Sequence, residues 1–155
     1  FPASCANKLR AQSCVCKTIT VFVSSNRFRE DLQQYGNVAT STLLTASSDT
    51  QTITSAALRC LEQIYVPGIM YKKSGVVLSD ISQDSPLQLD LFLNSPKLKE
   101  RNNLMHTLDN INHRDGVKTL HLAVEGTECQ AWNVKCEHRS RNYLTNINDI
   151  LTIKI

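Results

Sequence analysis

The spacing of hydrophobic residues predicts alternating helices and strands in the first half of the chain. Small and apolar side chains recur with helical spacing over residues 2–13, and an alternation of period two follows over 14–23. A run rich in β-branched residues at 38–45 predicts a second strand, and 71–81 predicts a third. With a helix between the last two strands, this order indicates an α+β module whose helices lie on one face of a sheet.

Local signals support these elements. Ser47-Ser48-Asp49 offers N-cap side chains for the middle helix, and Val66-Pro67-Gly68 ends it. The expected buried stripe of this helix consists of Ile53, Ala57, Leu61 and Ile64. In the first strand, one face carries Ile19, Val21 and Val23, and the other carries Thr18, Thr20 and Phe22.

The second half of the chain predicts fewer elements. Ser95-Pro96 supplies an N-cap and a first helical residue for a helix that ends near Asn112. Alternation predicts a strand over 118–124, and 151–155 could form a last short strand. We therefore divide the chain into a module at 1–85, a linker at 86–95 and a helix–strand extension at 96–155.

The linker contains an apolar stretch between Pro86 and Pro96, residues that tend to stop regular structure. Its alternation is that of a short edge strand, which the pattern alone favours. The alternative is a linear peptide offered to a pocket on another protein, with four anchoring side chains. These anchors would be Gln88, Leu89, Leu91 and Phe92.

Composition limits the class of protein. The chain has 155 residues and is 41% hydrophobic, so it can form a packed core, and its net charge of +3 permits nucleic-acid contact without requiring it. No apolar run approaches the roughly 20 residues of a membrane span. The six cysteines lack the spacing of a zinc site, so we expect structural thiols and no metal. Because the chain begins at Phe1 rather than Met, we expect a fragment of a longer protein.

Catalytic patterns are missing from the sequence, whereas a phosphate-binding pattern is present. The fourteen acidic residues are scattered, and no phosphate-binding loop or nucleophile motif occurs, so we assign no catalytic residue. Lys72-Lys73-Ser74-Gly75 joins two cations, a hydroxyl and an unencumbered backbone, which suits phosphate contacts. Lys17, Thr18 and Thr20 could extend this surface. The alternative is an ordinary solvated edge of a sheet.

Many ordered positions resemble one protein family. Residues 58–65 (LRCLEQIY), 71–80 (YKKSGVVLSD), 104–112 (LMHTLDNIN) and 137–145 (EHRSRNYLT) carry the similarity, together with Trp132. The chain resembles the C-terminal little-finger domain and tail of the UmuC family, the catalytic subunits of DNA polymerase V among the Y-family translesion polymerases. The resemblance spans nearly the whole chain.

The resemblance implies a non-catalytic part of an error-prone polymerase in SOS DNA repair, in the cytoplasm at the nucleoid. The catalytic domains and their Mg²⁺ would lie upstream, and this fragment would need no cofactor. It would grip the template–primer duplex through phosphates, using Lys72, Lys73, Ser74 and Gly75, with Lys17, Thr18 and Thr20 as weaker contacts. The β sliding clamp would bind the motif Gln88, Leu89, Asp90, Leu91 and Phe92.

Further partners of the family are the UmuD′ dimer and the RecA filament, for which the sequence indicates no residues. The alternative function is a protein-interaction scaffold without DNA affinity. Two departures from the family also bear on function. The tail at 140–145 reads SRNYLT where the family usually has Ser-Pro-Arg-Tyr-Thr-Thr. The family's first strand precedes its first helix, so we expect an open sheet position that the C-terminal strand or a neighbouring molecule could fill.

Overall fold

The structure is a computed structural model that describes residues 1–84, 95–116, 119–126 and 140, without the side chains of 95–99. The chain forms two compact units, Phe1–His121 and Leu122–Ile155. The interpretations of 85–94 as a strand or a docking peptide, and of 151–155 as a strand, fall outside the described residues. Among the described residues, no helix combines the length and apolarity needed to cross a bilayer.

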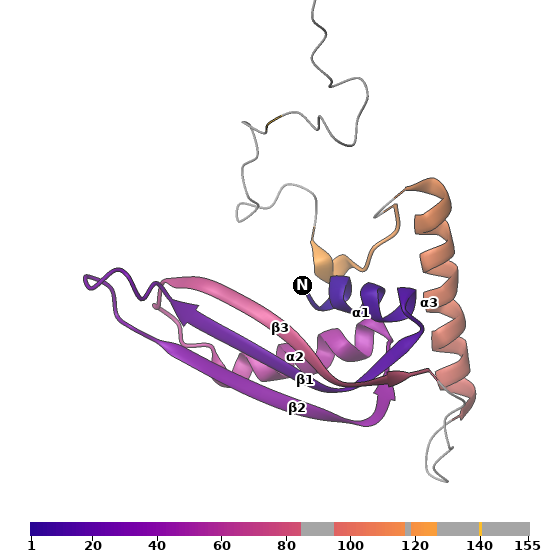
Figure 1. The fold of residues 1–155 in the computed structure, drawn as a ribbon, viewed down its shortest axis with the longest axis horizontal. Coiled ribbons are helices and arrows are strands. Elements are labelled where there is room, and N and C mark those ends of the chain that lie inside the picture. Colours follow the sequence, from indigo (N-terminus) through magenta and orange to yellow (C-terminus); the bar gives the residue numbers. More distant parts are fainter. Residues whose placement is uncertain (85–94, 117–118, 127–139, 141–155) are drawn as a thin grey trace, which may run out of the picture. The chain divides into compact units, whose positions relative to one another are not determined.

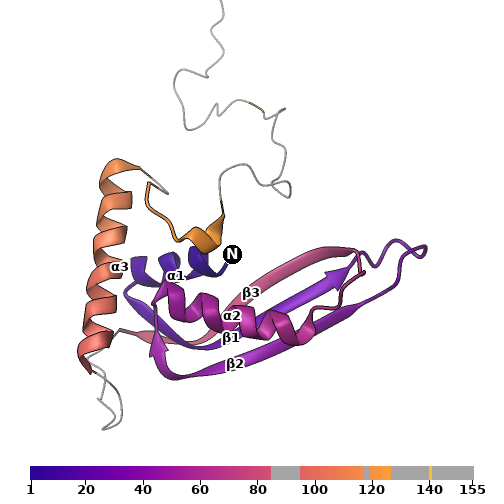
Figure 2. The same cartoon turned by 180° about the vertical axis from the view of Figure 1, so that it is seen from behind.

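The first unit confirms the predicted order of elements (Figure 1). The succession is α1 (Pro2–Ala11), β1 (Cys14–Ser25), β2 (Gly36–Ser47), α2 (Thr50–Ile64), β3 (Tyr71–Gln83) and α3 (Ser95–Asp115). Figure 2 shows α1 and α2 together on one face of the sheet, as the α+β prediction requires.

The sheet is antiparallel, with β1 between β2 and β3, so β2 and β3 are the edge strands of the described sheet. The alternation expected in β1 is present. Ile19, Val21 and Val23 are at most 4% exposed and face the helices. They pack with Ile53, Ala57 and Ile64 of α2, three of the four residues predicted for its stripe. Apolar burial on this one face holds the helices against the sheet.

The cysteines that the structure describes act as part of this packing. Cys16 and Cys60 are buried, Cys5 and Cys14 are partly buried, and all four are free thiols. For these four residues this agrees with the expectation of structural thiols, since a buried free cysteine packs as a small hydrophobic residue. Cys129 and Cys136 lie outside the described residues.

The start of α2 follows the predicted capping pattern. The Asp49 carboxylate accepts a 2.9 Å hydrogen bond from the Thr52 backbone N–H and a 2.5 Å bond from the Thr52 hydroxyl. These bonds satisfy a donor that the first turn of a helix leaves unpaired. Pro67 follows shortly after the helix end at Ile64, where the chain turns towards β3.

Helix α3 packs against the end of the first module. Met105 is only 4% exposed. The Arg10 guanidinium of α1 donates to Asp109 at 2.6 and 2.9 Å, and Arg101 donates to Gln51 of α2 at 2.8 Å. The sequence predicted that this helix ends near Asn112, but it continues to Asp115. The beginning of the predicted extension is therefore part of the first unit.

The strand predicted over 118–124 is wrong for the residues that the structure describes there. Residues 119–122 form no strand, and Ala123–Glu125 forms a short 3-10 helix in the second unit. The Asn112 side chain bonds both the backbone N–H and the carbonyl of Leu120, at 2.8 Å each. These backbone groups are thus satisfied without a neighbouring strand. Leu120 and Val124 are about half exposed, so their alternation buries no face.

Candidate nucleic-acid interface

The face of the sheet opposite α1 and α2 carries most of the predicted DNA contacts; we call it the open face. Residues directly opposite each other on paired strands share a face. Because Ile19 and Val21 face the helices, the residues that alternate with them face away. By register the open face contains Thr18, Thr20, Phe22 and Ser24 of β1, Val38, Thr40 and Thr42 of β2, and Lys73, Gly75, Val77 and Ser79 of β3.

The predicted Lys72–Gly75 motif is divided between two faces. Lys73 lies opposite Ser24, whereas Ser74 lies opposite Val23, which is buried on the helix side. The register shifts between Ser24 and Ser25, which leaves Lys72 as the extra residue of a bulge. Ser74 is therefore not positioned with Lys73 on the open face. Both lysines are exposed.

Gly75 has a packing role that the sequence did not reveal. The ring of Phe22 lies across it from the paired strand, and a Cβ placed on Gly75 would lie 2.5 Å from Cε1 of that ring. No real Cβ atom tolerates this approach, so the position accepts a larger residue only if the ring moves. A glycine inside a strand often marks a close approach, and here an aromatic side chain of the same sheet makes it.

The remaining predicted contacts lie towards the other end of β1. The Thr18 hydroxyl donates to the carboxylate of Asp80, and the Thr20 and Thr40 hydroxyls are 3.0 Å apart. Lys17 is exposed. Asp80 adds a negative charge at this point, so the end of the open face near Lys17 is less suited to phosphate than the end near Lys73.

The two ends of the open face are well separated. The pairs Ser24–Lys73 and Thr18–Ser79 are six positions apart along β1. At about 3.3 Å per residue, this corresponds to roughly 20 Å. Hydroxyl side chains fill much of the interval. The predicted residues therefore form an extended surface rather than one compact site.

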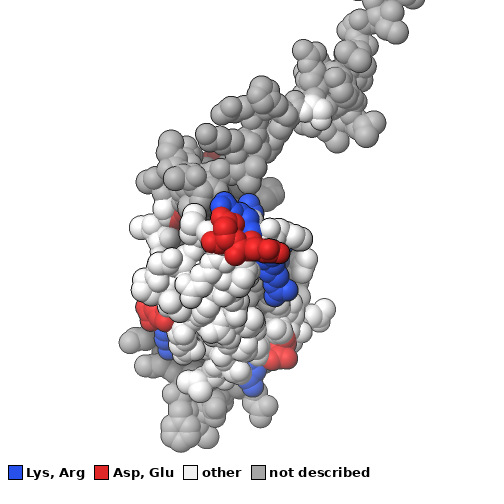
Figure 3. All heavy atoms as spheres, turned by 90° about the vertical axis from the view of Figure 1, so that its left-hand side faces the viewer, with Lys and Arg blue, Asp and Glu red and all other residues white. Residues whose placement is uncertain are grey.

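The loop between β1 and β2 adds little net positive charge. Arg29 donates to Asp31 at 3.0 Å, and this pair is exposed. Figure 3 shows this end of the sheet, where basic and acidic side chains lie beside each other around an uncharged surface. Among the residues predicted to contact DNA, Lys72 and Lys73 on β3 are therefore the cations at this end of the sheet.

The described residues contain no group of three or more histidine, cysteine or acidic side chains that could hold a metal ion. Burial raises the pKa of the Cys16 thiol above its ordinary value, and burial also raises the pKa of Cys60 despite the opposing effect of Arg59. Both thiols are therefore protonated at neutral pH and unsuited to nucleophilic chemistry.

Sequence reasoning missed three features of this face: the ring of Phe22 over Gly75, the carboxylate of Asp80 beside Thr18, and the Thr20–Thr40 pair. The alternation in β1 predicted that Phe22 shares a face with Thr18 and Thr20. Which residues of β2 and β3 lie opposite them depends on the register of strand pairing, and the sequence of one strand does not determine that register.

Comparison with known proteins adds independent information. A family model described as the impB/mucB/samB family C-terminal domain matches residues 2–91, and a domain of unknown function (DUF4113) matches 102–153. The chain is 37% identical to Protein UmuC of Salmonella typhimurium over 99% of this chain and 36% of that protein. It is 36% identical to Protein SamB of Salmonella typhimurium, and 35% to Protein MucB of Escherichia coli, each over 97% of this chain and 35% of the relative. The chain thus spans about a third of the length of the curated relatives it matches.

Proposed function

The chain belongs to the impB/mucB/samB family, as a C-terminal domain of the translesion polymerase group that includes UmuC, and we propose that its open face grips a template–primer duplex through backbone phosphates. The contact would be weakly dependent on base sequence, because phosphates carry no direct sequence information. It would serve DNA repair and mutagenesis by keeping the polymerase on damaged template.

One observation carries this proposal: two adjacent exposed lysines lie at the edge of a sheet face that no described helix covers. Lys72 and Lys73 make no hydrogen bond or ion pair with the residues that the structure describes. Their charges are therefore available to phosphates. Thr20, Thr40 and Thr42 add hydroxyl groups along the same face.

The share of its relatives that this chain covers bears on where nucleotide transfer would take place. It covers about a third of each relative, and its described residues hold no cluster of carboxylates for Mg²⁺. We assign nucleotide transfer and its metal ions to other parts of a full polymerase. A chain that holds DNA in this way would be associated with the nucleoid.

We also propose that residues 88–92 dock a β sliding clamp. This rests on the sequence QLDLF alone, since the segment lies outside the described residues. Gln88, Leu89 and Phe92 would enter an apolar cleft of the clamp. UmuD′ and RecA remain proposed partners from the family resemblance, with no residues assigned.

The test is duplex binding by the whole chain, measured by fluorescence anisotropy at moderate salt. Lys72→Ala with Lys73→Ala should weaken binding about tenfold or more, since two phosphate contacts are lost. The matched control is Lys8→Ala with Arg59→Ala, which removes two exposed cations from α1 and α2 on the other side of the sheet.

The control should bind as the wild type does. Equal affinity of the lysine variant and the wild type would overturn the proposal. Wild-type chain that binds the clamp but not the duplex would instead support the alternative, a protein-interaction scaffold.

A further inference from the structure

Tyr71 closes the turn that leads from α2 into β3, immediately before the two exposed lysines. Its hydroxyl accepts a 2.8 Å hydrogen bond from the Val66 backbone N–H and donates a 3.0 Å bond to the Val66 carbonyl. A phenolic hydroxyl can do both at once. The first residue of β3 is therefore fastened through its own side chain to the segment that follows α2.

The ring of Tyr71 also has partners. It packs against the core, with the Tyr35 ring edge-to-face at a centroid distance of 6.0 Å and the Tyr65 ring at 5.6 Å. Aromatic pairs are favourable at such separations. The backbone of Tyr35 is bonded in turn to Ser25: its carbonyl accepts from the Ser25 N–H at 2.8 Å, and its N–H donates to the Ser25 hydroxyl at 2.9 Å. The ring of Tyr71 is thus held at the end of β1.

This arrangement decides which residue of β3 lies opposite Ser25. Ser24 lies opposite Lys73, so an unbroken ladder would next place Lys72 opposite Ser25. Ser25 is only 4% exposed, and a lysine paired with it would face the opposite side of the sheet from Lys73. Instead Tyr71 lies opposite Ser25, and the bulge leaves Lys72 exposed beside Lys73.

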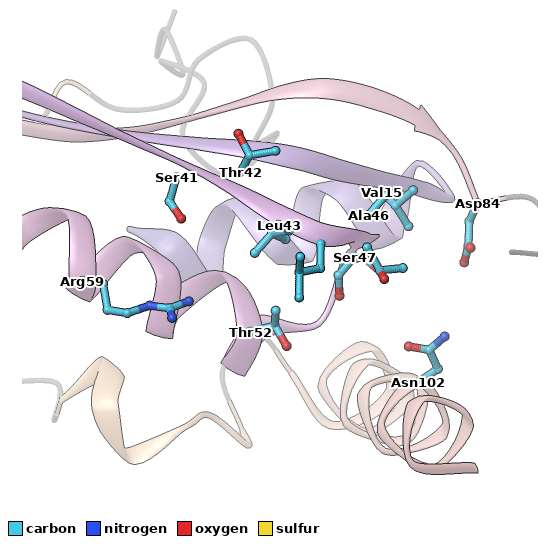
Figure 4. A pocket seen from close by; sticks show the side chains of 13 residues that line it. Val15, Ser41, Thr42, Leu43, Ala46, Ser47, Thr52, Arg59, Asp84 and Asn102 are labelled. Atoms are coloured by element: carbon cyan, nitrogen blue, oxygen red, sulfur yellow. The ribbon is translucent and has the colours of Figure 1, made fainter. Parts of the chain in front are cut away.

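The charge of these two lysines is not offset by a described carboxylate, unlike that of two exposed arginines elsewhere in the first unit. Arg29 pairs with Asp31. Arg59 lines a groove of about 370 Å³ beside β2, and the wall of this groove also contains Asp84 (Figure 4). The bulge therefore concerns the part of the open face where two cations adjoin without an acidic partner among the described residues.

We propose that Tyr71 is a positioning residue of the DNA interface. Its hydroxyl holds the bulge that keeps Lys72 next to Lys73, so that the two ammonium groups contact neighbouring phosphates of one DNA strand. Because each ammonium group ends a flexible four-carbon stem, the backbone must supply the spacing of the pair. Tyr71 touches no phosphate and acts through Lys72. This role rests on the function proposed above and deepens it.

The first test is the salt dependence of duplex binding by the whole chain. Tyr71→Phe keeps the ring and removes both bonds to Val66. We expect the slope of log K against log salt concentration to become shallower by about 0.9, the value of one phosphate contact. The same substitution in a Lys72→Ala background should change the slope no further. The matched control is Tyr35→Phe, which removes a hydroxyl bonded to the Ile64 carbonyl at 2.7 Å and should keep the wild-type slope.

The second test needs no DNA. In isotope-labelled chain, nuclear Overhauser contacts across the strands should place Ser25 next to Tyr71 in the wild type. In the Tyr71→Phe protein they should place Ser25 next to Lys72, because the ladder then continues without the bulge. A Tyr71→Phe protein in which position 71 still lies opposite Ser25 would overturn the proposal, whatever its affinity for DNA.

Three results of the binding experiment also overturn it: a wild-type slope in Tyr71→Phe, a further loss in the Lys72→Ala background, or an equal loss in Tyr35→Phe. The last would mean that any damage at this end of the sheet weakens binding. Failure of the DNA function itself gives a different result. Lys72→Ala with Lys73→Ala would then bind as the wild type does, while the register still changes in Tyr71→Phe.

Discussion

The Arg10 guanidinium on α1 and the Asp109 carboxylate on α3 form a two-point ion pair, although 99 positions separate them in the sequence. The Arg10 side chain is 5% exposed and also donates to the Ser48 carbonyl and the Thr50 hydroxyl, at 2.8 Å each. One buried side chain thus joins α1, α3 and the entrance to α2. It also joins the regions matched by the two family models.

Removing Arg10 should destabilise the first unit strongly. Arg10→Ala leaves Asp109 and the Ser48 carbonyl without their donor, and because the Asp109 side chain is 32% exposed the cost should lie near the lower end of the roughly 3–5 kcal/mol of a fully buried pair. Asp109→Ala should cost less, about 1–3 kcal/mol, because Arg10 keeps its hydrogen bonds to Asn7, Ser48 and Thr50. Urea unfolding measures both changes.

The control is Asp115→Ala, which removes a carboxylate from the exposed pair with Arg114 and should change stability little. If Arg10→Ala unfolds at the same urea concentration as Asp115→Ala, then the Arg10–Asp109 pair does not stabilise the packing of α3.

Gly75 should be sensitive to substitution because of Phe22, and not because of phosphate. Gly75→Ala should lower the free energy of unfolding by about 1–3 kcal/mol, since the added Cβ displaces the ring. The double variant Phe22→Leu with Gly75→Ala also replaces the ring by a smaller side chain. It should lose less stability than the sum of the losses in the two single variants. Thermal or urea unfolding of the four proteins gives this coupling.

The same double variant separates packing from DNA contact. If Gly75 serves only the sheet, the folded double variant should bind duplex DNA as the wild type does. Additive stability losses, or a loss of DNA binding in the folded double variant, would speak against the packing role.

Stability should fall at alkaline pH because of the buried thiols. Burial raises the pKa of Cys16 and Cys60 in the folded state, so the unfolded state loses these protons first as pH rises. Their contribution is complete below the unfolded thiol pKa, about 8.5, and is lost as pH rises through the folded value. Cys16→Ala with Cys60→Ala should be less stable at pH 7 but lose less stability above pH 8.5. Parallel pH profiles of the two proteins would refute this account.

The linker should determine clamp binding. Leu91→Ala with Phe92→Ala removes two apolar anchors from the proposed peptide, and we expect at least a hundredfold loss of affinity for a purified β sliding clamp. Leu104→Ala with Val77→Ala, two residues about half exposed in the first unit, is the matched control. Surface plasmon resonance measures both. A clamp that binds all three proteins equally does not use this motif.

The main elements of the first unit were predictable because each depends on local periodicity. Alternation in β1, the stripe of α2 and the cap at Asp49 all act over a few residues. The strand expected at 118–124 failed because alternation alone cannot supply a pairing partner, and Asn112 instead bonds the backbone of Leu120.

The candidate site was predictable only in part. Lys72-Lys73-Ser74-Gly75 predicted either phosphate contacts or an ordinary solvated edge, and both lysines are exposed. Their division from Ser74 depends on a bulge at Lys72, and the bulge depends on pairing with β1. The same limit applies to Arg10 and Asp109, since nothing in the sequence near either residue identifies the other.

The most direct test of DNA gripping is the salt dependence of duplex affinity. If Lys72 and Lys73 each neutralise one phosphate, removing both should make the slope of log K against log salt concentration shallower by about 1.8. The variant Lys8→Ala with Arg59→Ala should keep the wild-type slope. We predict the shallower slope for the Lys72→Ala, Lys73→Ala protein alone; identical slopes in all three proteins would contradict the account.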